Sequence, residues 1–309
     1  MSSLRASVEQ VRGVLQSVSE SDFSLFHSCV TALLEQRANA LRDHRVEDAR
    51  QAMRAVRETL RSKVSLGGAP SEKLHFLGLG EFEGVTRDNC VQVDEFLWED
   101  EDVDELCDAG HMSRNYCVDC GSHNVKPLTF LSNSLPLESI EFVFSDSVLG
   151  DLSGKTVLDV GSRLGVVLYG AFQYSNASRI VGVEKDPFFG DLQVDVIKKH
   201  NMGDRVKVIC GDVFDPQWLP ELQTADVVVL HNVFEFFTST VEELRECYSK
   251  CRSLFSRPGV RIVASPSLEE SLHNCDSTMP LEDWVEEIPL EYPQGLDPDT
   301  GEIGPQQEH

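Results

Sequence analysis

The chain has 309 residues, 41% of them apolar, and a formal net charge of −25. This length allows about two domains, and the apolar share allows a packed core, which excludes a chain that is disordered throughout. The 52 acidic residues against 27 basic ones repel phosphate backbones, so direct duplex nucleic-acid binding is not expected. The charge either serves solubility alone or favours a basic partner, such as a basic protein.

The sequence shows no sign of membrane insertion or export. No apolar run approaches the roughly 20 residues that span a bilayer, and the N-terminus lacks the basic and apolar regions of a signal peptide. The nine cysteines are an odd number and cannot all pair within one chain. We therefore expect reduced thiols and a cytoplasmic or nuclear protein; the oligomeric state is left open.

Residues 1–66 are predicted to form a helical domain, which serves packing, substrate docking or dimerisation. A second helix is predicted to begin near residues 19–22, where serine and aspartate can cap it, and a third to cover residues 45–63. Glycine and proline at residues 67–70 end the pattern. The first helix is predicted from apolar residues at helical spacing, namely Leu4, Val8, Val11 and Leu15.

Residues 67–150 are predicted to form an irregular segment. Residues 94–108 carry nine acidic side chains around Trp98. Such runs are usually solvated loops, although this one could also form a groove edge for a basic substrate.

A Cys-x-x-Cys-Gly motif at residues 117–121 has the form of a zinc knuckle, in which backbone amides stabilise the thiolates. A zinc site needs four ligands, and further candidates are His75, Cys90 and His123. The alternative is free thiols. The preferred set of ligands is Cys107, His111, Cys117 and Cys120.

Residues 151–292 alternate between strands and helices. Short apolar runs predict strands at residues 156–160, 179–184, 206–210, 226–230 and 260–264, and helical patterns cover residues 190–200 and 241–255. Continuous β-branched runs are typical of strands covered on both faces, so we predict a doubly wound α/β domain with a parallel sheet. Residues 293–309, rich in glycine, proline and acid, are predicted to be disordered.

A glycine-rich turn follows the first strand, at residues 159–165. Glycine lets a backbone turn tightly and approach a ligand closely. The nicotinamide fingerprint Gly-x-Gly-x-x-Gly fails here, because Arg163 and Val166 stand where its second and third glycines belong after Gly161. A Walker loop fails too, because no Gly-Lys-Ser/Thr follows.

An acidic residue ends each of the next two strands. Glu184 ends the second strand and can accept both ribose hydroxyls of an adenosine ligand. Asp212 follows the third strand and can accept the adenine amino group, with Val213 as an apolar neighbour of the ring. Each acid alone is more often a helix cap or surface residue, but their order along the strands is specific.

This arrangement resembles the class I S-adenosylmethionine-dependent methyltransferases over residues 150–265. The resemblance implies a Rossmann-like fold with S-adenosyl-L-methionine as cofactor. It also implies that Glu184 holds the ribose and Asp212 the adenine. The methionine end is then lined by Asp159, Gly161, Ser162 and Gly165.

The end of the fourth strand resembles histone-lysine methyltransferases of the disruptor-of-telomeric-silencing type, with His231 where those enzymes have a second Asn. No proline follows Asn232, unlike in enzymes that methylate amino groups of nucleic acids. The matching residues are Gly182-Val183-Glu184, Gly211-Asp212, Trp218 and His231-Asn232 with Phe234 and Phe236.

The resemblance implies methyl transfer to a side-chain nitrogen, such as that of lysine, in a basic protein. Asn232 would orient the amine, Phe234 would wall the site, and His231 would take the proton. Core packing is the alternative role for Phe234, and a structural role for His231. The alternative functions are an RNA methyltransferase that uses the Cys-x-x-Cys module or a partner, and a non-catalytic cofactor-binding adaptor.

Overall fold

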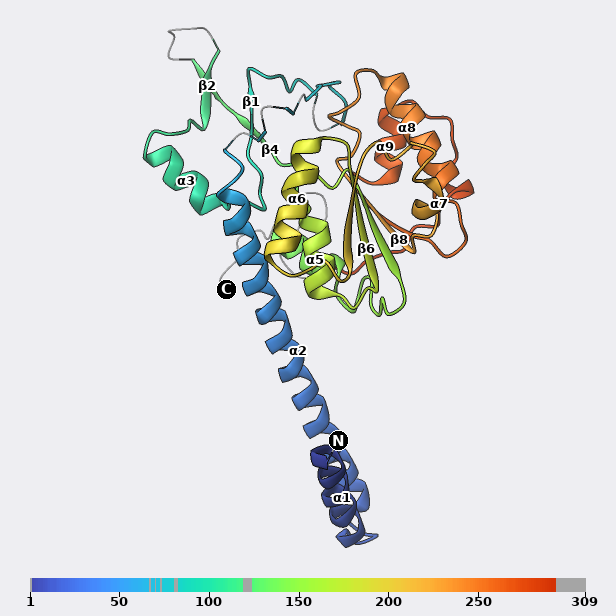
Figure 1. Ribbon diagram of the computed structural model, residues 1–309. Helices are drawn as coiled ribbons and strands as arrows, with labels where there is room; N and C mark the ends of the chain where they lie inside the picture. The colour runs from blue at the N-terminus through green and yellow to red at the C-terminus, as the bar shows by residue number, and fades with distance from the viewer. Residues whose placement is uncertain are drawn as a thin grey trace. The chain divides into compact units, whose positions relative to one another are not determined.

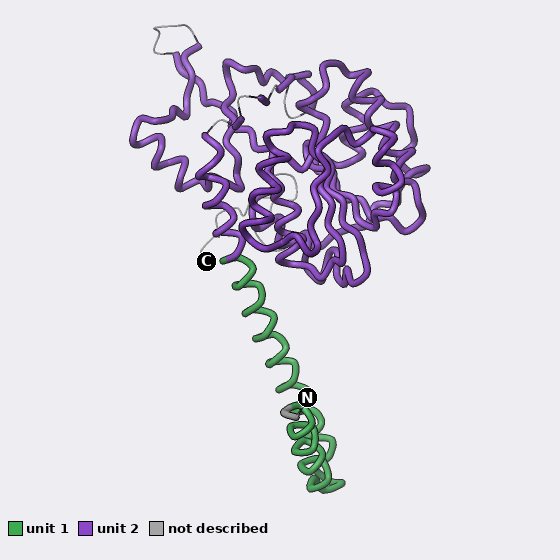
Figure 2. Tube along the Cα trace, in the orientation of Figure 1, with its two compact units in different colours: residues 1–51 green, residues 52–309 purple. Residues whose placement is uncertain are grey.

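The computed structural model describes residues 2–66, 68–69, 71–72, 74–80, 83–118 and 124–292. The chain divides into two compact units, residues 1–51 and 52–309 (Figure 2). The predicted disordered tail, residues 293–309, lies outside the described residues. Among the described residues, none of the helices is both long and apolar enough to cross a membrane.

Unit 1 is a helical hairpin made of α1 (Ser2–Ser17) and the first part of α2 (Phe23–Arg61) (Figure 1). The predicted separate helix at residues 45–63 is wrong, because α2 runs unbroken through this region. The physical reason is that no glycine or proline occurs between Phe23 and Arg61 to interrupt the backbone hydrogen bonds.

Unit 2 contains the end of α2 and a parallel five-stranded sheet. The strands are β5 (Thr156–Val160), β6 (Arg179–Glu184), β7 (Val206–Cys210), β8 (Val227–His231) and β9 (Arg261–Ser265). Their order across the sheet is β7-β6-β5-β8-β9, so the strand order reverses beside β5. This is the topology of a doubly wound, Rossmann-like α/β fold, and in such folds ligands bind at the carboxyl ends of strands near the reversal.

Helices cover both faces of this sheet. The end of α2, α4 (Leu137–Val143), α5 (Val166–Tyr174) and α6 (Pro187–Lys199) bury one face, and α7 (Leu219–Leu222), α8 (Val241–Leu254) and α9 (Leu268–Asn274) bury the other. Successive strand residues belong to opposite clusters, Val157 to one and Leu158 to the other. Both faces are therefore apolar, which explains the continuous apolar runs.

The strand and helix predictions for residues 151–292 are confirmed. β5, β6 and β7 have the predicted bounds, and β8 and β9 lie one residue later than predicted. α6 begins three residues before the predicted helical pattern, and α6 and α8 each end one residue before theirs. Asp186 caps α6 by accepting from the Phe188 N–H, and Thr240 caps α8 by accepting from the Glu243 N–H.

The segment between α2 and β5 forms small elements beside the sheet. They are β1 (Cys90–Gln92), which pairs in parallel with β4 (Thr129–Leu131), the helix α3 (Asp100–Asp108), and the hairpin of β2 (Asn115–Cys117) and β3 (Val125–Pro127). A short 3-10 helix (Leu281–Asp283) follows α9, outside this segment. The predicted solvated loop at residues 94–108 is wrong. Residues 100–108 are helical with a capping box at Glu99, and Asp94 is buried because it pairs with an arginine.

Candidate functional site

The predicted cofactor loop folds back onto the end of β6. The Gly161 and Ser162 N–H groups donate to the Val183 carbonyl at 2.9 and 3.1 Å, and the Arg163 N–H donates to Glu184 Oε2 at 2.7 Å. Gly161 and Gly165 have φ angles of +70° and +81°, in the left-handed region that favours glycine. The glycine loop is thus hydrogen-bonded directly to the Glu184 carboxylate.

Close packing also requires the two glycines. A Cβ on Gly161 would lie 2.7 Å from Val233 Cγ2, and a Cβ on Gly165 would lie 2.6 Å from the Tyr169 hydroxyl. Both distances are shorter than normal van der Waals contact. The glycines therefore let the loop approach both β8 and α5.

Glu184 is a buried carboxylate at the tip of β6, with 8% of the residue exposed. Burial raises its pKa, and N–H groups of Asp186 and Arg163 oppose this effect. Each carboxylate oxygen accepts one of these backbone hydrogen bonds, at 2.7 Å. Because a carboxylate has about four acceptor positions, two remain for a diol such as that of ribose.

Asp212 lies next to Glu184, because the Gly211 N–H donates to the Glu184 carbonyl at 2.8 Å. Partial burial disfavours its charge, but the Phe214 N–H at 2.9 Å and Lys185 Nζ at 3.0 Å outweigh this, so its pKa is lowered. Asp212 therefore stays ionised at neutral pH, and Val213 beside it is 8% exposed. The structure brings the two acids and the glycine loop together.

Asp159, which precedes the loop, is only 4% exposed. Burial and the nearby charge of Glu184 raise its pKa well above the ordinary value. The hydroxyl of Tyr169, which faces Gly165, is buried and has no hydrogen-bond partner in the described part of the chain. The Ser162 hydroxyl, in contrast, donates to Gln193 Oε1 at 3.0 Å and is already engaged.

Arg163 joins the loop to the preceding segment of the chain. Its guanidinium contacts Glu72 Oε1 at 2.6 Å and pairs with Asp94, and all three side chains are at most 8% exposed. In the sequence, Arg163 is notable only because it stands where the nicotinamide pattern needs its second glycine. Its position in a glycine-rich loop after a strand was the one local sign of a special role. Its partners could not be predicted locally, because Glu72 and Asp94 lie 91 and 69 residues away in the chain.

His231 and Asn232 lie where β8 ends, beside the glycine loop. Both ring nitrogens of His231 are buried and lack a hydrogen-bond partner among the described residues, and burial lowers its pKa to about 4. Asn232 has a φ of +45°; its N–H donates to the Ser265 carbonyl at 2.8 Å, and its Nδ2 lies 3.5 Å from the Ser132 carbonyl. The amide oxygen of Asn232 is left as an acceptor.

Phe234 packs in the core beyond this point. It is 7% exposed, stacks on Phe214 at a centroid distance of 5.9 Å and meets Tyr248 edge-on at 5.5 Å. These contacts are those of a core packing residue. The predicted role of Phe234 as a wall of the site beside the methyl group stays a prediction. Phe236 is buried in a separate small cluster with Val85.

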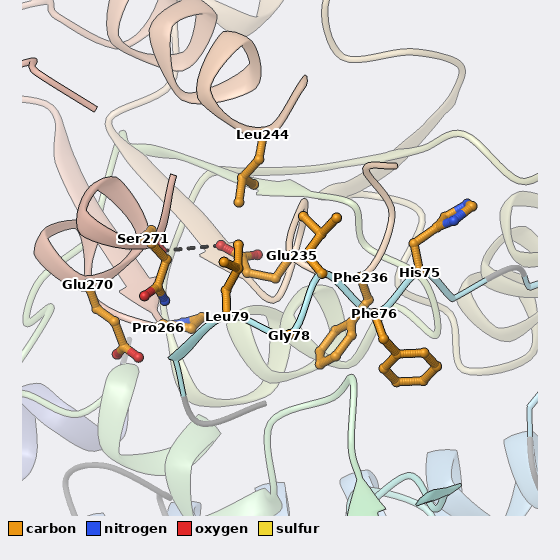
Figure 3. A pocket seen from close by; sticks show the side chains of 12 residues that line it. His75, Phe76, Gly78, Leu79, Glu235, Phe236, Leu244, Pro266, Glu270 and Ser271 are labelled. Carbon is orange, nitrogen blue, oxygen red and sulfur yellow. Dashed lines mark hydrogen bonds between the residues drawn. The ribbon is translucent and has the colours of Figure 1, made fainter. Parts of the chain in front are cut away.

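A small pocket lies behind this segment (Figure 3). Its lining includes Phe76, Leu79, Phe236 and the carboxylate of Glu235. Glu235 Oε1 accepts hydrogen bonds from the Tyr248 hydroxyl and, at 3.2 Å, from Ser271 Oγ. Sequence reasoning missed Glu235, whose acceptor positions serve to hold α8 and α9 to the loop after β8.

The proposed zinc ligands are only partly described. Cys107 lies in α3, Cys117 ends β2, and Cys120 falls outside the described residues. Within the described ranges, no group of three or more His, Cys, Asp or Glu side chains could hold a metal, so Cys107, His111 and Cys117 do not form such a group with each other or with other described residues. The zinc site therefore stays a prediction.

The chain is similar in sequence to ribosomal protein L11 methyltransferases. It is 27% identical to those of Klebsiella pneumoniae and Escherichia fergusonii over 184 residues, which cover 59% of this chain and 57% of each relative. The chain thus spans little more than half the length of these relatives. No family model matches it.

Solved structures of methyltransferases also align with part of the chain. An RNA methyltransferase from Salinibacter ruber in complex with S-adenosyl-L-homocysteine covers 42% of this chain and 76% of its own, with 20% identity and a TM-score of 0.33. An O-methyltransferase from Bacillus cereus covers 47% and 69%, with 16% identity and a TM-score of 0.34. The sequence likeness and the strand order together support a class I methyltransferase fold.

Proposed function

We propose that this chain is an S-adenosylmethionine-dependent methyltransferase. The main support is that hydrogen bonds hold Glu184, Asp212 and the glycine loop close together at the carboxyl ends of adjacent strands. The Arg163 N–H reaches Glu184 at 2.7 Å, and the Gly211 N–H reaches the Glu184 carbonyl at 2.8 Å. A ribose and an adenine ring need two acceptors placed side by side in this way.

The residues present fit this cofactor. Glu184 would accept the ribose hydroxyls, Asp212 the adenine amino group, and the left-handed turn at Gly161 and Gly165 would admit the amino-acid end. When bound, the cofactor supplies an activated methyl group on a cationic sulfur. Burial disfavours the charged forms of Asp159 and Glu184, and a ligand that carries positive charge would offset this effect, because a nearby opposite charge lowers the pKa of a carboxyl group.

We propose a side-chain nitrogen of a basic protein, such as a lysine amine, as the methyl acceptor. The net charge of −25 would attract a basic protein and repel free RNA, and the relatives named above are called ribosomal protein methyltransferases. The amide oxygen of Asn232 would orient the amine at the tip of β8. Positioning of this kind accounts for much of the rate in an in-line displacement.

His231 would act as a neutral hydrogen-bond acceptor. With a pKa of about 4, it is uncharged at pH 7 and is too weak a base to hold a proton taken from an alkyl ammonium, whose ordinary pKa is about 10.4. The burial that lowers the pKa of His231 would also favour the deprotonated amine, because desolvation disfavours the charged form, and the deprotonated amine is the form that can attack a methyl group.

The test is incubation of the purified chain and lysate with cofactor labelled on the methyl group. Label that survives RNase and is lost to protease supports a protein acceptor, and label lost to RNase alone would establish the RNA methyltransferase instead. A chain that binds the cofactor but transfers no label to lysate or purified basic proteins would be an adaptor. The Glu184→Ala variant serves as the control, because it removes the ribose contact.

A further inference from the structure

Asn133 carries a buried amide that forms no hydrogen bond with any described residue. The residue is 7% exposed, and neither its Oδ1 nor its Nδ2 has a hydrogen-bond partner among the described residues. Leaving such groups unpaired is unfavourable, so they are rare in folded proteins, and each one calls for an explanation such as a binding partner.

The neighbours of Asn133 are tied to the candidate site on two sides. The Ser132 carbonyl lies 3.5 Å from Asn232 Nδ2 at the tip of β8. On the other side, Ser134 Oγ donates to Asp94 at 2.7 Å, and the same carboxylate oxygen of Asp94 pairs with Arg163 of the glycine loop. Asn133 therefore lies on a strap, residues 132–134, that connects the tip of β8 to the glycine loop.

The local backbone holds this strap in place. Ser132 Oγ accepts from the Glu95 N–H at 3.1 Å and donates to the Ser134 carbonyl at 2.9 Å. Both serines beside Asn133 thus have partners within the protein, while Asn133 has none in the described ranges. A fixed backbone with an unpaired amide is the arrangement expected of a preorganised binding group.

We propose that Asn133 binds the amino-acid end of S-adenosylmethionine, an inference that rests on the proposed function. This end of the cofactor carries an α-ammonium and an α-carboxylate. The Asn133 Oδ1 would accept from the ammonium and Nδ2 would donate to the carboxylate, so that both unpaired atoms gain a charged partner. An acceptor amine would satisfy only the oxygen, because its lone pair has to face the methyl group and is not free to accept from Nδ2.

The test compares two ligands by calorimetry on the full chain. S-adenosyl-L-homocysteine carries the amino-acid end, and 5′-methylthioadenosine has the same adenosine and a thioether but lacks it. We expect Asn133→Ala to weaken S-adenosyl-L-homocysteine about 10- to 100-fold, the effect of losing hydrogen bonds to charged groups, and to leave 5′-methylthioadenosine within about threefold. Asn274→Ala, the same truncation at a half-buried position of α9, should change neither affinity.

A second variant and a melting curve separate binding from folding. Asn133→Asp keeps the acceptor but replaces the donor with a charge that repels the carboxylate, so it should also weaken S-adenosyl-L-homocysteine selectively. Without ligand, Asn133→Ala should melt no more than about 3 °C below the wild type, because the amide makes no hydrogen bond to a described residue.

The possible outcomes are distinguishable. Equal losses for both ligands would show that Asn133 only maintains the pocket, and unchanged affinities with a raised KM for the acceptor would assign it to the substrate; either result overturns the inference and leaves the proposed function standing. A wild-type chain that binds neither ligand would overturn both.

Discussion

The buried cluster of Arg163, Glu72 and Asp94 allows a sharp prediction about stability. Arg163→Met removes the cation that pairs with two carboxylates, each of which is 6% exposed. Breaking a buried ion pair costs about 3–5 kcal/mol, because charge remains buried without compensation. For a unit of this size, that corresponds to a melting temperature about 6–20 °C lower. Asp94 retains bonds from Ser134 and the Leu97 N–H, which favours the lower part of this range.

Thermal unfolding followed by circular dichroism measures the effect. Arg114→Met, which breaks an exposed pair with Asp104, should lower the melting temperature far less, because exposed ion pairs contribute little to stability. A triple variant that adds Glu72→Gln and Asp94→Asn should recover at least half of the loss, because no unpaired charge is then buried. A shift below about 2 °C for Arg163→Met, or a triple variant as unstable as the single one, would refute the reasoning.

Three further predictions concern pH, backbone and metal. Burial lowers the pKa of His231 to about 4 in the folded state, so its contribution to the free energy of unfolding is complete above pH 6.5 and is lost as the pH falls toward 4. At 1.36 kcal/mol per pH unit, this contribution amounts to roughly 3 kcal/mol. Urea titrations at several pH values should show that the His231→Gln variant loses less stability over this range than the wild type. Gly165→Ala should unfold at a lower temperature than Gly259→Ala, since both have positive φ but only Gly165 would place a Cβ against Tyr169; equal melting temperatures would contradict this. If zinc is bound, metal analysis should find about one ion per chain and none in Cys117→Ser; unchanged zinc in that variant would exclude the knuckle.

The sequence was most informative where one local pattern determines the structure. Val157 and Leu158 are both buried, on opposite faces of β5, and such strands are visible as continuous apolar runs. Glu184 and Asp212 could be identified from their positions at the ends of these runs. The parallel pairing of β5, β6 and β7 then brings their carboxyl ends together.

Features that depend on distant contacts could not be predicted in this way. Asp94 belongs to an acidic run that looks solvated, and only the fold brings Arg163, 69 residues later, against it. Asn133 has no local pattern at all, because its importance lies in burial without a partner. The continuity of α2 was not predicted for another reason. Polar residues with good helix propensity connect its two apolar stretches, so the helix continues where the apolar pattern is interrupted.

The most direct test of the central claim is a calorimetric titration of the wild-type chain and its Glu184→Ala variant with S-adenosyl-L-homocysteine. We expect binding to the wild type and an affinity about 100-fold lower in the variant, because two hydroxyl groups lose a buried charged acceptor. No heat with the wild type, under conditions in which a known methyltransferase binds this ligand, would contradict the account. Equal affinities for both proteins would show that Glu184 does not hold the ribose.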